Sequence, residues 1–130
     1  MSRQTYIFTG PPGSADVVMG IIQATMGRAF TYEAGSQPYV RADPVAVYVG
    51  GHDFDDGDID TPDGTPVALK TGYPVQVEVN DIERDRERQE DVAARIFDAI
   101  RADGRLRAVY IDDMQHVLDV YSPGASPASG

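Results

Sequence analysis

Residues 73–104 read YPVQVEVNDIERDRERQEDVAARIFDAIRADG, and this stretch decides the fold. Val75, Val77 and Val79 alternate with polar residues, which is the period of a β-strand with one buried face. Farther along, apolar residues at helical spacing form one stripe, made of Val92, Ala93, Ile96, Phe97 and Ile100. Gly104 follows the stripe and is suited to end a helix. A half-buried strand and an amphipathic helix together predict a sheet with a helix packed on it.

The remaining apolar segments predict further strands and one further helix. The strands are expected at residues 5–9, 45–49, 106–111 and 116–121, with weaker candidates at 39–40 and 67–69. A helix is expected from Ser14, a residue type that caps helices, to about Arg28. The order strand, helix, strand, strand, helix, strand, strand predicts an α+β fold. We expect a ferredoxin-like split βαβ sheet with an extra C-terminal strand and both helices on one face.

The length of 130 residues, with 42% hydrophobic residues, fits one globular domain. We expect that domain to span residues 1–121, and residues 122–130 to form a disordered tail because they include no apolar side chain larger than alanine or proline. The absence of cysteine excludes a disulfide, a thiolate zinc site and a cysteine nucleophile. No segment reads as a signal peptide or a membrane span, so the expected location is the cytoplasm.

The formal net charge of −10 restricts the partners that the protein can bind. An acidic surface repels nucleic-acid backbones and anionic membranes, and it attracts basic surfaces. We therefore expect neither a nucleic-acid nor a membrane partner. A genome-wide or high-salt bias toward acidic residues is an alternative origin for this charge.

The most unusual segment is residues 52–63, which holds six aspartates: Asp53, Asp55, Asp56, Asp58, Asp60 and Asp63. Oxygen ligands of this type suit calcium, and a cation would be held by Asp55, Asp58, Asp60 and Asp63. The spacing does not match a calcium-binding loop, because Pro62 and Asp63 occupy the fifth and sixth positions counted from Asp58. No cofactor is expected, and Ca²⁺ remains an alternative. A contact with a basic partner and a solvated loop are the other interpretations.

Sequence motifs give little support for catalysis. Residues 10–17 fail the phosphate-loop pattern, since Ala15, Asp16 and Val17 stand where glycine, lysine and a hydroxyl residue belong. The two histidines, His52 and His116, have no recognisable nucleophile or metal motif beside them. We predict no catalytic residue and favour a protein that is not an enzyme.

Two functional hypotheses remain. In the first, a non-enzymatic acidic module binds a basic protein surface through the six aspartates and Tyr48 on the adjoining sheet; an immunity or antitoxin-like protein that neutralises a cationic toxin or nuclease is its most specific form. In the second, a homodimer pairs its sheets through Tyr6, Tyr48 and Tyr110, and its Asp-rich loop 52–63 binds a small ligand or a divalent cation. In either case the sheet face opposite the helices must be covered by the long loop, by the final hairpin or by another chain.

Overall fold

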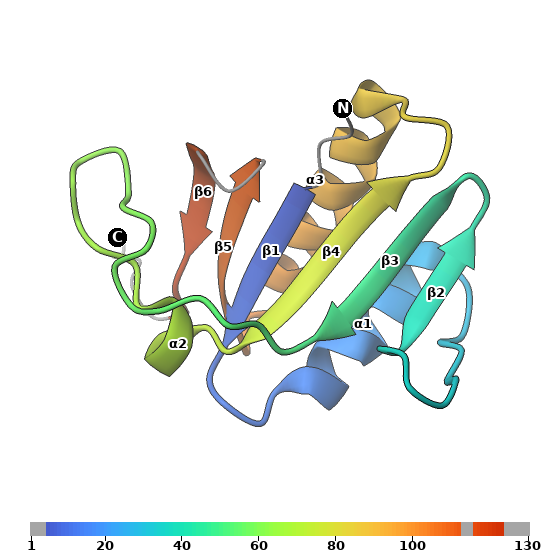
Figure 1. The fold of residues 1–130 in the computed structure, drawn as a ribbon, viewed down its shortest axis with the longest axis horizontal. Coiled ribbons are helices and arrows are strands. Elements are labelled where there is room, and N and C mark those ends of the chain that lie inside the picture. Colours follow the sequence, from blue (N-terminus) through green and yellow to red (C-terminus); the bar gives the residue numbers. More distant parts are fainter. Residues whose placement is uncertain (1–4, 113–115, 124–130) are drawn as a thin grey trace.

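The computed structural model describes residues 5–112 and 116–123 as an α+β fold built on a six-stranded antiparallel sheet (Figure 1). The strand order is β2-β3-β4-β1-β5-β6. In chain order the elements are β1 (Thr5–Gly10), α1 (Ala15–Met26), β2 (Tyr39–Ala42), β3 (Val45–Gly50), α2 (Leu69–Gly72), β4 (Val75–Asp81), α3 (Arg86–Asp103), β5 (Arg107–Asp112) and β6 (His116–Tyr121). The predicted disordered tail lies, from residue 124 onward, outside the described residues.

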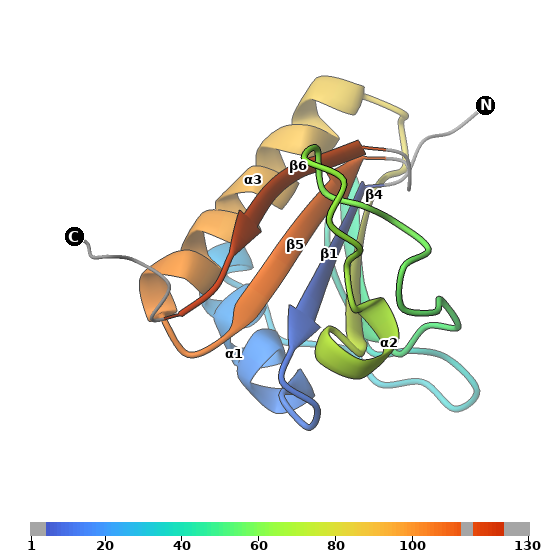
Figure 2. The same ribbon diagram turned by 90° about the vertical axis from the view of Figure 1, so that its left-hand side faces the viewer.

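The main core lies between one face of the sheet and the two long helices, α1 and α3 (Figure 2). Val75, Val77 and Val79 of β4 point into this core, as their alternation predicts. The helical stripe that begins at Val92 is buried against them, also as predicted. The placement of both long helices on a single face is therefore confirmed.

Local sequence signals explain the limits of α3. Asp85 caps its start by accepting a hydrogen bond from the Arg88 backbone N–H at 3.0 Å. Gly104 ends it in the left-handed conformation, with a φ of 79°, which suits glycine because it has no Cβ. Arg86 Nε and Glu90 Oε2 lie 3.0 Å apart and form an i,i+4 ion pair in the first part of the helix.

The structure corrects three sequence-based expectations. The six-strand order is not that of a ferredoxin sheet, because β2 and β6 lie at its two edges. Residues 67–69 are not a strand, since Val67 lies in a loop and Leu69 begins the one-turn helix α2. Ser14 occupies the position before α1, but its side chain makes no capping hydrogen bond.

A close backbone approach fixes the start of the loop that follows β1. A Cβ added to Gly10 would lie 1.9 Å from the carbonyl oxygen of Gly72, so only glycine fits there. The same carbonyl accepts a hydrogen bond from Arg107 Nε at 2.7 Å. This contact joins the end of β1, the end of α2 and the beginning of β5 at one corner of the sheet.

Candidate functional site

Residues 51–74, which we call the cover segment, cross the face of the sheet opposite α1 and α3 (Figure 2). They close a second apolar core over β1 and β5, whose buried members are Phe8, Ile59, Val67, Leu69, Val109 and Ile111. The long loop, one of the three coverings considered from the sequence, therefore covers this part of the face. The outer faces of β2, β3 and β4 are not part of this core, and we call them the uncovered half.

His52 joins the beginning of the cover segment to its end and packs against β1 of the sheet. Its Nε2 donates a hydrogen bond to the Tyr73 carbonyl oxygen at 2.9 Å, and its Nδ1 accepts one from the Phe54 backbone N–H at 3.1 Å. Its ring also packs edge-on against Phe8, with 5.0 Å between centroids. Because the carbonyl only accepts and the amide only donates, these contacts fit a single neutral tautomer. Both ring nitrogens of the half-buried His52 are thus occupied by contacts within the cover segment.

Asp56 is exposed, and its carboxylate is directed toward α2, which it holds by hydrogen bonds. It accepts hydrogen bonds from the backbone N–H groups of Thr71 at 3.0 Å and of Lys70 at 2.8 Å, and from the Thr71 hydroxyl at 2.9 Å. The bond from the Thr71 N–H is the main reason that the pKa of Asp56 lies below its ordinary value. Asp56 thus shapes the loop, and its predicted contact with a partner stays a prediction.

Asp58 and Asp63 also make contacts within the cover segment. Asp58 accepts a hydrogen bond from the Asp55 backbone N–H at 2.8 Å. Asp63 accepts from the Thr61 hydroxyl and from the Thr65 backbone N–H. The Thr61 hydroxyl is the main reason that the pKa of Asp63 is lowered. Both side chains remain exposed, so they shape the turn and still contribute negative charge to the surface.

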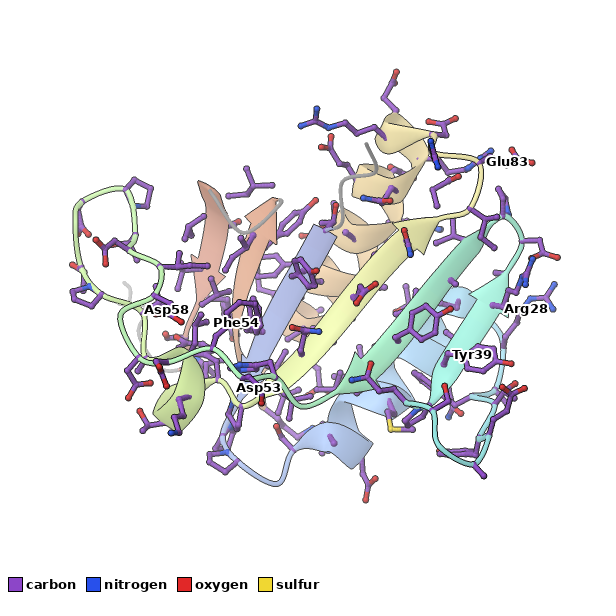
Figure 3. All side chains as sticks on the ribbon, in the orientation of Figure 1. Arg28, Tyr39, Asp53, Phe54, Asp58 and Glu83 are labelled. Atoms are coloured by element: carbon purple, nitrogen blue, oxygen red, sulfur yellow. The ribbon has the colours of Figure 1, made fainter. Side chains whose placement is uncertain are left out.

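Asp53, Asp55 and Asp60 are the remaining predicted site residues, and all three are exposed. Lys70 lies close to one of them, with its Nζ 3.9 Å from Asp55 Oδ1. This long contact between exposed groups neutralises little of the local charge. In Figure 3 Asp53 lies near the ends of β1 and β4, whereas Asp58 lies farther out along the cover segment. The predicted acids therefore form an extended ridge.

The four aspartates named as cation ligands, Asp55, Asp58, Asp60 and Asp63, are not gathered around one point. Across residues 5–112 and 116–123, no group of three or more histidine or acidic side chains has an arrangement that could hold a metal ion. The residue types are those of a calcium site, but the geometry of this structure does not assemble one.

Tyr48, the remaining predicted partner-binding residue, lies apart from the aspartates on the uncovered half. It is half-buried on β3, and its ring packs against that of Tyr39 on β2, with 5.6 Å between centroids. Figure 3 shows Tyr39 over the edge strand β2, whereas Asp58 lies toward the other edge of the sheet. The outer face thus carries two separate candidate regions, the ridge of aspartates and the uncovered half.

The tyrosines proposed for a paired sheet do not share one surface. Tyr110 points toward the helices, is 8% exposed, and donates a hydrogen bond from its hydroxyl to the Glu90 carbonyl oxygen at 3.2 Å. Tyr6 packs on the second apolar core beside Phe8. Of these three tyrosines, only Tyr48 belongs to the uncovered half. The expectation of a common tyrosine surface is therefore wrong.

Sequence reasoning missed an enclosed ionic network at the end of β4. Asp81, the first residue of a charged run, is 3% exposed and accepts hydrogen bonds from Arg88 Nε at 2.6 Å and from the Glu83 N–H at 2.8 Å. The bonds from Arg88 are the main cause of the lowered pKa of Asp81. Gln89 links this network to Thr5 of β1. The sequence did hold a signal for the burial of Asp81, because position 81 continues the alternation of the buried residues Val75, Val77 and Val79.

Comparison with protein-family models, with curated proteins and with solved structures gave no match. In the described part of the chain, no helix has the length and apolar character needed to cross a membrane. The functional argument therefore rests on the geometry of the two outer-face regions.

Proposed function

We propose that this protein is a non-enzymatic interaction module that binds a basic protein surface through the aspartate ridge of its cover segment. The observation that carries this proposal is the division of the segment into two sides. Ile59, Val67 and Leu69 are buried on the sheet, whereas Asp53, Asp55, Asp58 and Asp60 are exposed. The acids are thus held on a surface that is already folded.

Prior ordering of a loop favours association, because less conformational entropy is lost when the partner binds. The second apolar core and the two hydrogen bonds of His52 supply this ordering. A structureless acidic loop would offer the same charge but would be ordered only at the moment of binding. The anchoring therefore supports a preformed binding surface over a structureless acidic loop.

The charge of the ridge matches a basic partner. Its six aspartates face one nearby lysine, Lys70, and the whole chain has a formal net charge of −10. Like-signed groups arranged along one surface speed the encounter with an oppositely charged protein and are screened by salt. An immunity or antitoxin-like activity, in which the module neutralises a cationic toxin or nuclease, is the most specific form of the proposal, and it rests on charge and size.

Affinity capture from the native lysate at low and high salt tests this proposal. The ridge variant carries Asp53→Asn, Asp55→Asn, Asp58→Asn and Asp60→Asn together. A matched control carries Asp16→Asn, Glu87→Gln, Asp91→Asn and Asp98→Asn, which change the charge equally on exposed positions of α1 and α3. Both variants should keep the native circular dichroism spectrum.

The expected result is a basic protein that is retained by the wild type and by the control at low salt, and that is released as salt rises. After purification, this basic protein should associate at least tenfold more slowly with the ridge variant than with the wild type, because charge steering sets the association rate. Equal retention by the ridge variant and the control would contradict the role of the ridge.

The alternative is a homodimer formed through the uncovered half, with a small ligand or a divalent cation in the Asp-rich loop. The exposure of this sheet face favours it. Sedimentation velocity over a range of protein concentrations distinguishes the two proposals, since a dimer should form without any other protein. A rise in melting temperature with calcium would support the cation, because a ligand that binds only the native state stabilises it.

We also infer a relation to the ferredoxin-like arrangement for the inner part of the sheet. Without the edge strands, the order is β3-β4-β1-β5, and α1 and α3 each connect two of these strands across one face. This order supports a split βαβ unit that has been extended by β2 and β6.

A further inference from the structure

A row of side chains crosses the three strands of the uncovered half and continues onto the neighbouring strand β1. The strand register places Tyr39 of β2 opposite Tyr48 of β3, and Tyr48 opposite Glu78 of β4. Glu78 in turn lies opposite Tyr6 of β1. Directly opposite residues on neighbouring antiparallel strands have Cβ atoms about 4.5–5.5 Å apart. A single carboxylate is therefore placed between two tyrosines on the same face of the sheet.

Glu78 lacks the partner that such a position calls for. Its side chain is half-buried, and among the residues that the structure describes it has no hydrogen-bond or ion-pair partner. Burial raises the pKa of this carboxyl group above its ordinary value. A partly desolvated carboxylate without a donor or a cation is costly, and a ligand that supplied either would remove that cost.

Glu78 lines a surface groove of ≈ 400 Å³. The lining residues are Gly35, Ser36, Gln37, Tyr48, Glu78 and Asn80. The side chain of Gln37 lies over Gly50, where an added Cβ would be only 2.4 Å from the Gln37 amide nitrogen. This packing holds the loop before β2 against the end of β3 and forms one wall of the groove. The lining supplies amide and hydroxyl oxygens and an aromatic ring beside the carboxylate.

The other charged groups near the groove already have partners. Arg41 on β2 is paired with Asp43, and the Tyr39 hydroxyl donates a hydrogen bond to Glu33 Oε2 at 3.0 Å. Arg41 therefore does not neutralise Glu78, and the groove keeps a negative charge at its base. An anionic ligand would be repelled there, and an apolar one would leave the carboxylate unpaired.

We infer that this groove binds the guanidinium or ammonium end of an arginine or lysine side chain on the basic partner. This inference rests on the proposed function, because it takes the basic partner from there. Glu78 supplies the opposite charge, and the ring of Tyr48 supplies a cation–π surface. The side-chain oxygen of Asn80 accepts a further N–H donor. The cover segment packs on the same sheet face that bears Glu78, so one protein surface can contact both the aspartate ridge and the groove.

The test uses a probe that does not require the partner to be known. N-acetyl-arginine methylamide is titrated into the ¹⁵N-labelled full chain, and amide chemical shifts are followed by NMR. N-acetyl-citrulline methylamide has nearly the same shape but no charge, so it isolates the contribution of the cation. Glu78→Gln removes the carboxylate charge, and Glu87→Gln, at an exposed position in the first turn of α3, makes the same change away from the groove.

The expected result is saturable shifts at Gln37, Tyr48, Glu78 and Asn80 with the arginine probe only. The dissociation constant should rise about fivefold in Glu78→Gln and stay unchanged in Glu87→Gln, which is the scale expected for one partly solvated charge contact. Equal affinity of Glu78→Gln and wild type, equal shifts from the citrulline probe, or shifts confined to residues 52–63 would each overturn the inference.

The outcome is separable from that of the proposed function. Capture of a basic protein that depends on the aspartate ridge, together with no probe binding in the groove, would leave the proposed function standing and refute the inference. Probe binding that depends on Glu78, together with no basic protein in the capture experiment, would support the groove chemistry and count against the proposed function.

Discussion

The two halves of the outer sheet face belong to one sheet but have opposite surfaces. Over β1 and β5, outward residues such as Phe8, Val109 and Ile111 are fully buried beneath the cover segment. Over β3 and β4, the corresponding positions hold Tyr48 and Glu78, which are only half-buried. The chain thus encloses the half that bears apolar side chains and leaves open the half that bears polar ones.

This difference shows how the sequence of each strand determines which of its faces is covered. β1 and β5 have apolar residues on both faces, as in Ile7 with Phe8 and Val109 with Tyr110, which is the pattern of strands buried on both sides. β4 alternates strictly, so only its valine face requires burial. The covered and uncovered halves therefore meet between β1, which is apolar on both faces, and β4, which alternates.

The largest expected effect comes from aromatic residues on the two halves. Phe8→Ala should lower the free energy of unfolding by about 3–5 kcal/mol, because it empties the centre of the second apolar core. Tyr48→Ala should lower it by only about 1 kcal/mol, since the ring is half-exposed and loses mainly cross-strand contacts. Urea denaturation of both variants measures the difference, and equal losses would refute the distinction between the halves.

A smaller effect is expected at the enclosed carboxylate of β4. At neutral pH, Asp81→Asn should be less stable than wild type by about 2–3 kcal/mol, because Arg88 loses its buried partner. The pKa of Asp81 is lowered in the folded state, so its stabilisation is present above its unfolded pKa of about 3.9 and is lost as pH falls. The stability gap between variant and wild type should therefore narrow below about pH 4. A gap that stays constant from pH 7 to pH 3 would contradict this prediction.

The attachment of the cover segment provides a third comparison. His52→Ala should cost about 1–2 kcal/mol, because it removes two hydrogen bonds and the contact with Phe8. Hydrogen exchange at Phe54 should accelerate at the same time. Tyr39→Phe, which removes one exposed hydrogen bond on the uncovered half, should change stability by less than about 0.5 kcal/mol. Unchanged exchange at Phe54 would show that His52 does not hold the segment.

The smallest change in the free energy of unfolding is expected at Glu78, where the substitution should stabilise the protein. Because burial raises the pKa of Glu78, its contribution to stability is greatest below its unfolded pKa of about 4.3 and is lost as pH rises through the folded value. Glu78→Gln should therefore be more stable than wild type at pH 7, by about 0.5 kcal/mol since the group is partly solvated. Thermal unfolding at pH 4 and pH 7 measures this, and a variant less stable at pH 7 would refute it.

The sequence predicted those parts of the fold that repeat regularly. The alternation of Val75, Val77 and Val79 and the stripe around Ile96 placed β4 and α3 and predicted the helix-covered face correctly. The face assignment of Tyr110 failed, because β5 is apolar on both sides and its alternation gives no orientation. The burial of Asp81 was missed because a charged residue beside a charged run reads as solvated.

The candidate site was predictable in composition but not in arrangement. The excess of aspartate in residues 52–63 was visible, yet nothing local showed that Asp56 bonds to α2 or that Ile59 lies on the sheet. These contacts depend on chain segments that meet only after folding. The pairing of Glu78 with Tyr48 likewise follows from strand register, which the alternation of β4 alone does not determine.

The cover segment separates two requirements that are often tied to the same residues. Its buried side chains maintain the fold, while Asp53, Asp55 and Asp60 have exposed side chains that the second apolar core does not include. Substitution at these three positions should therefore change the charge of the surface with little loss of stability. If the segment binds a partner as proposed, its specificity can change while the buried scaffold stays the same.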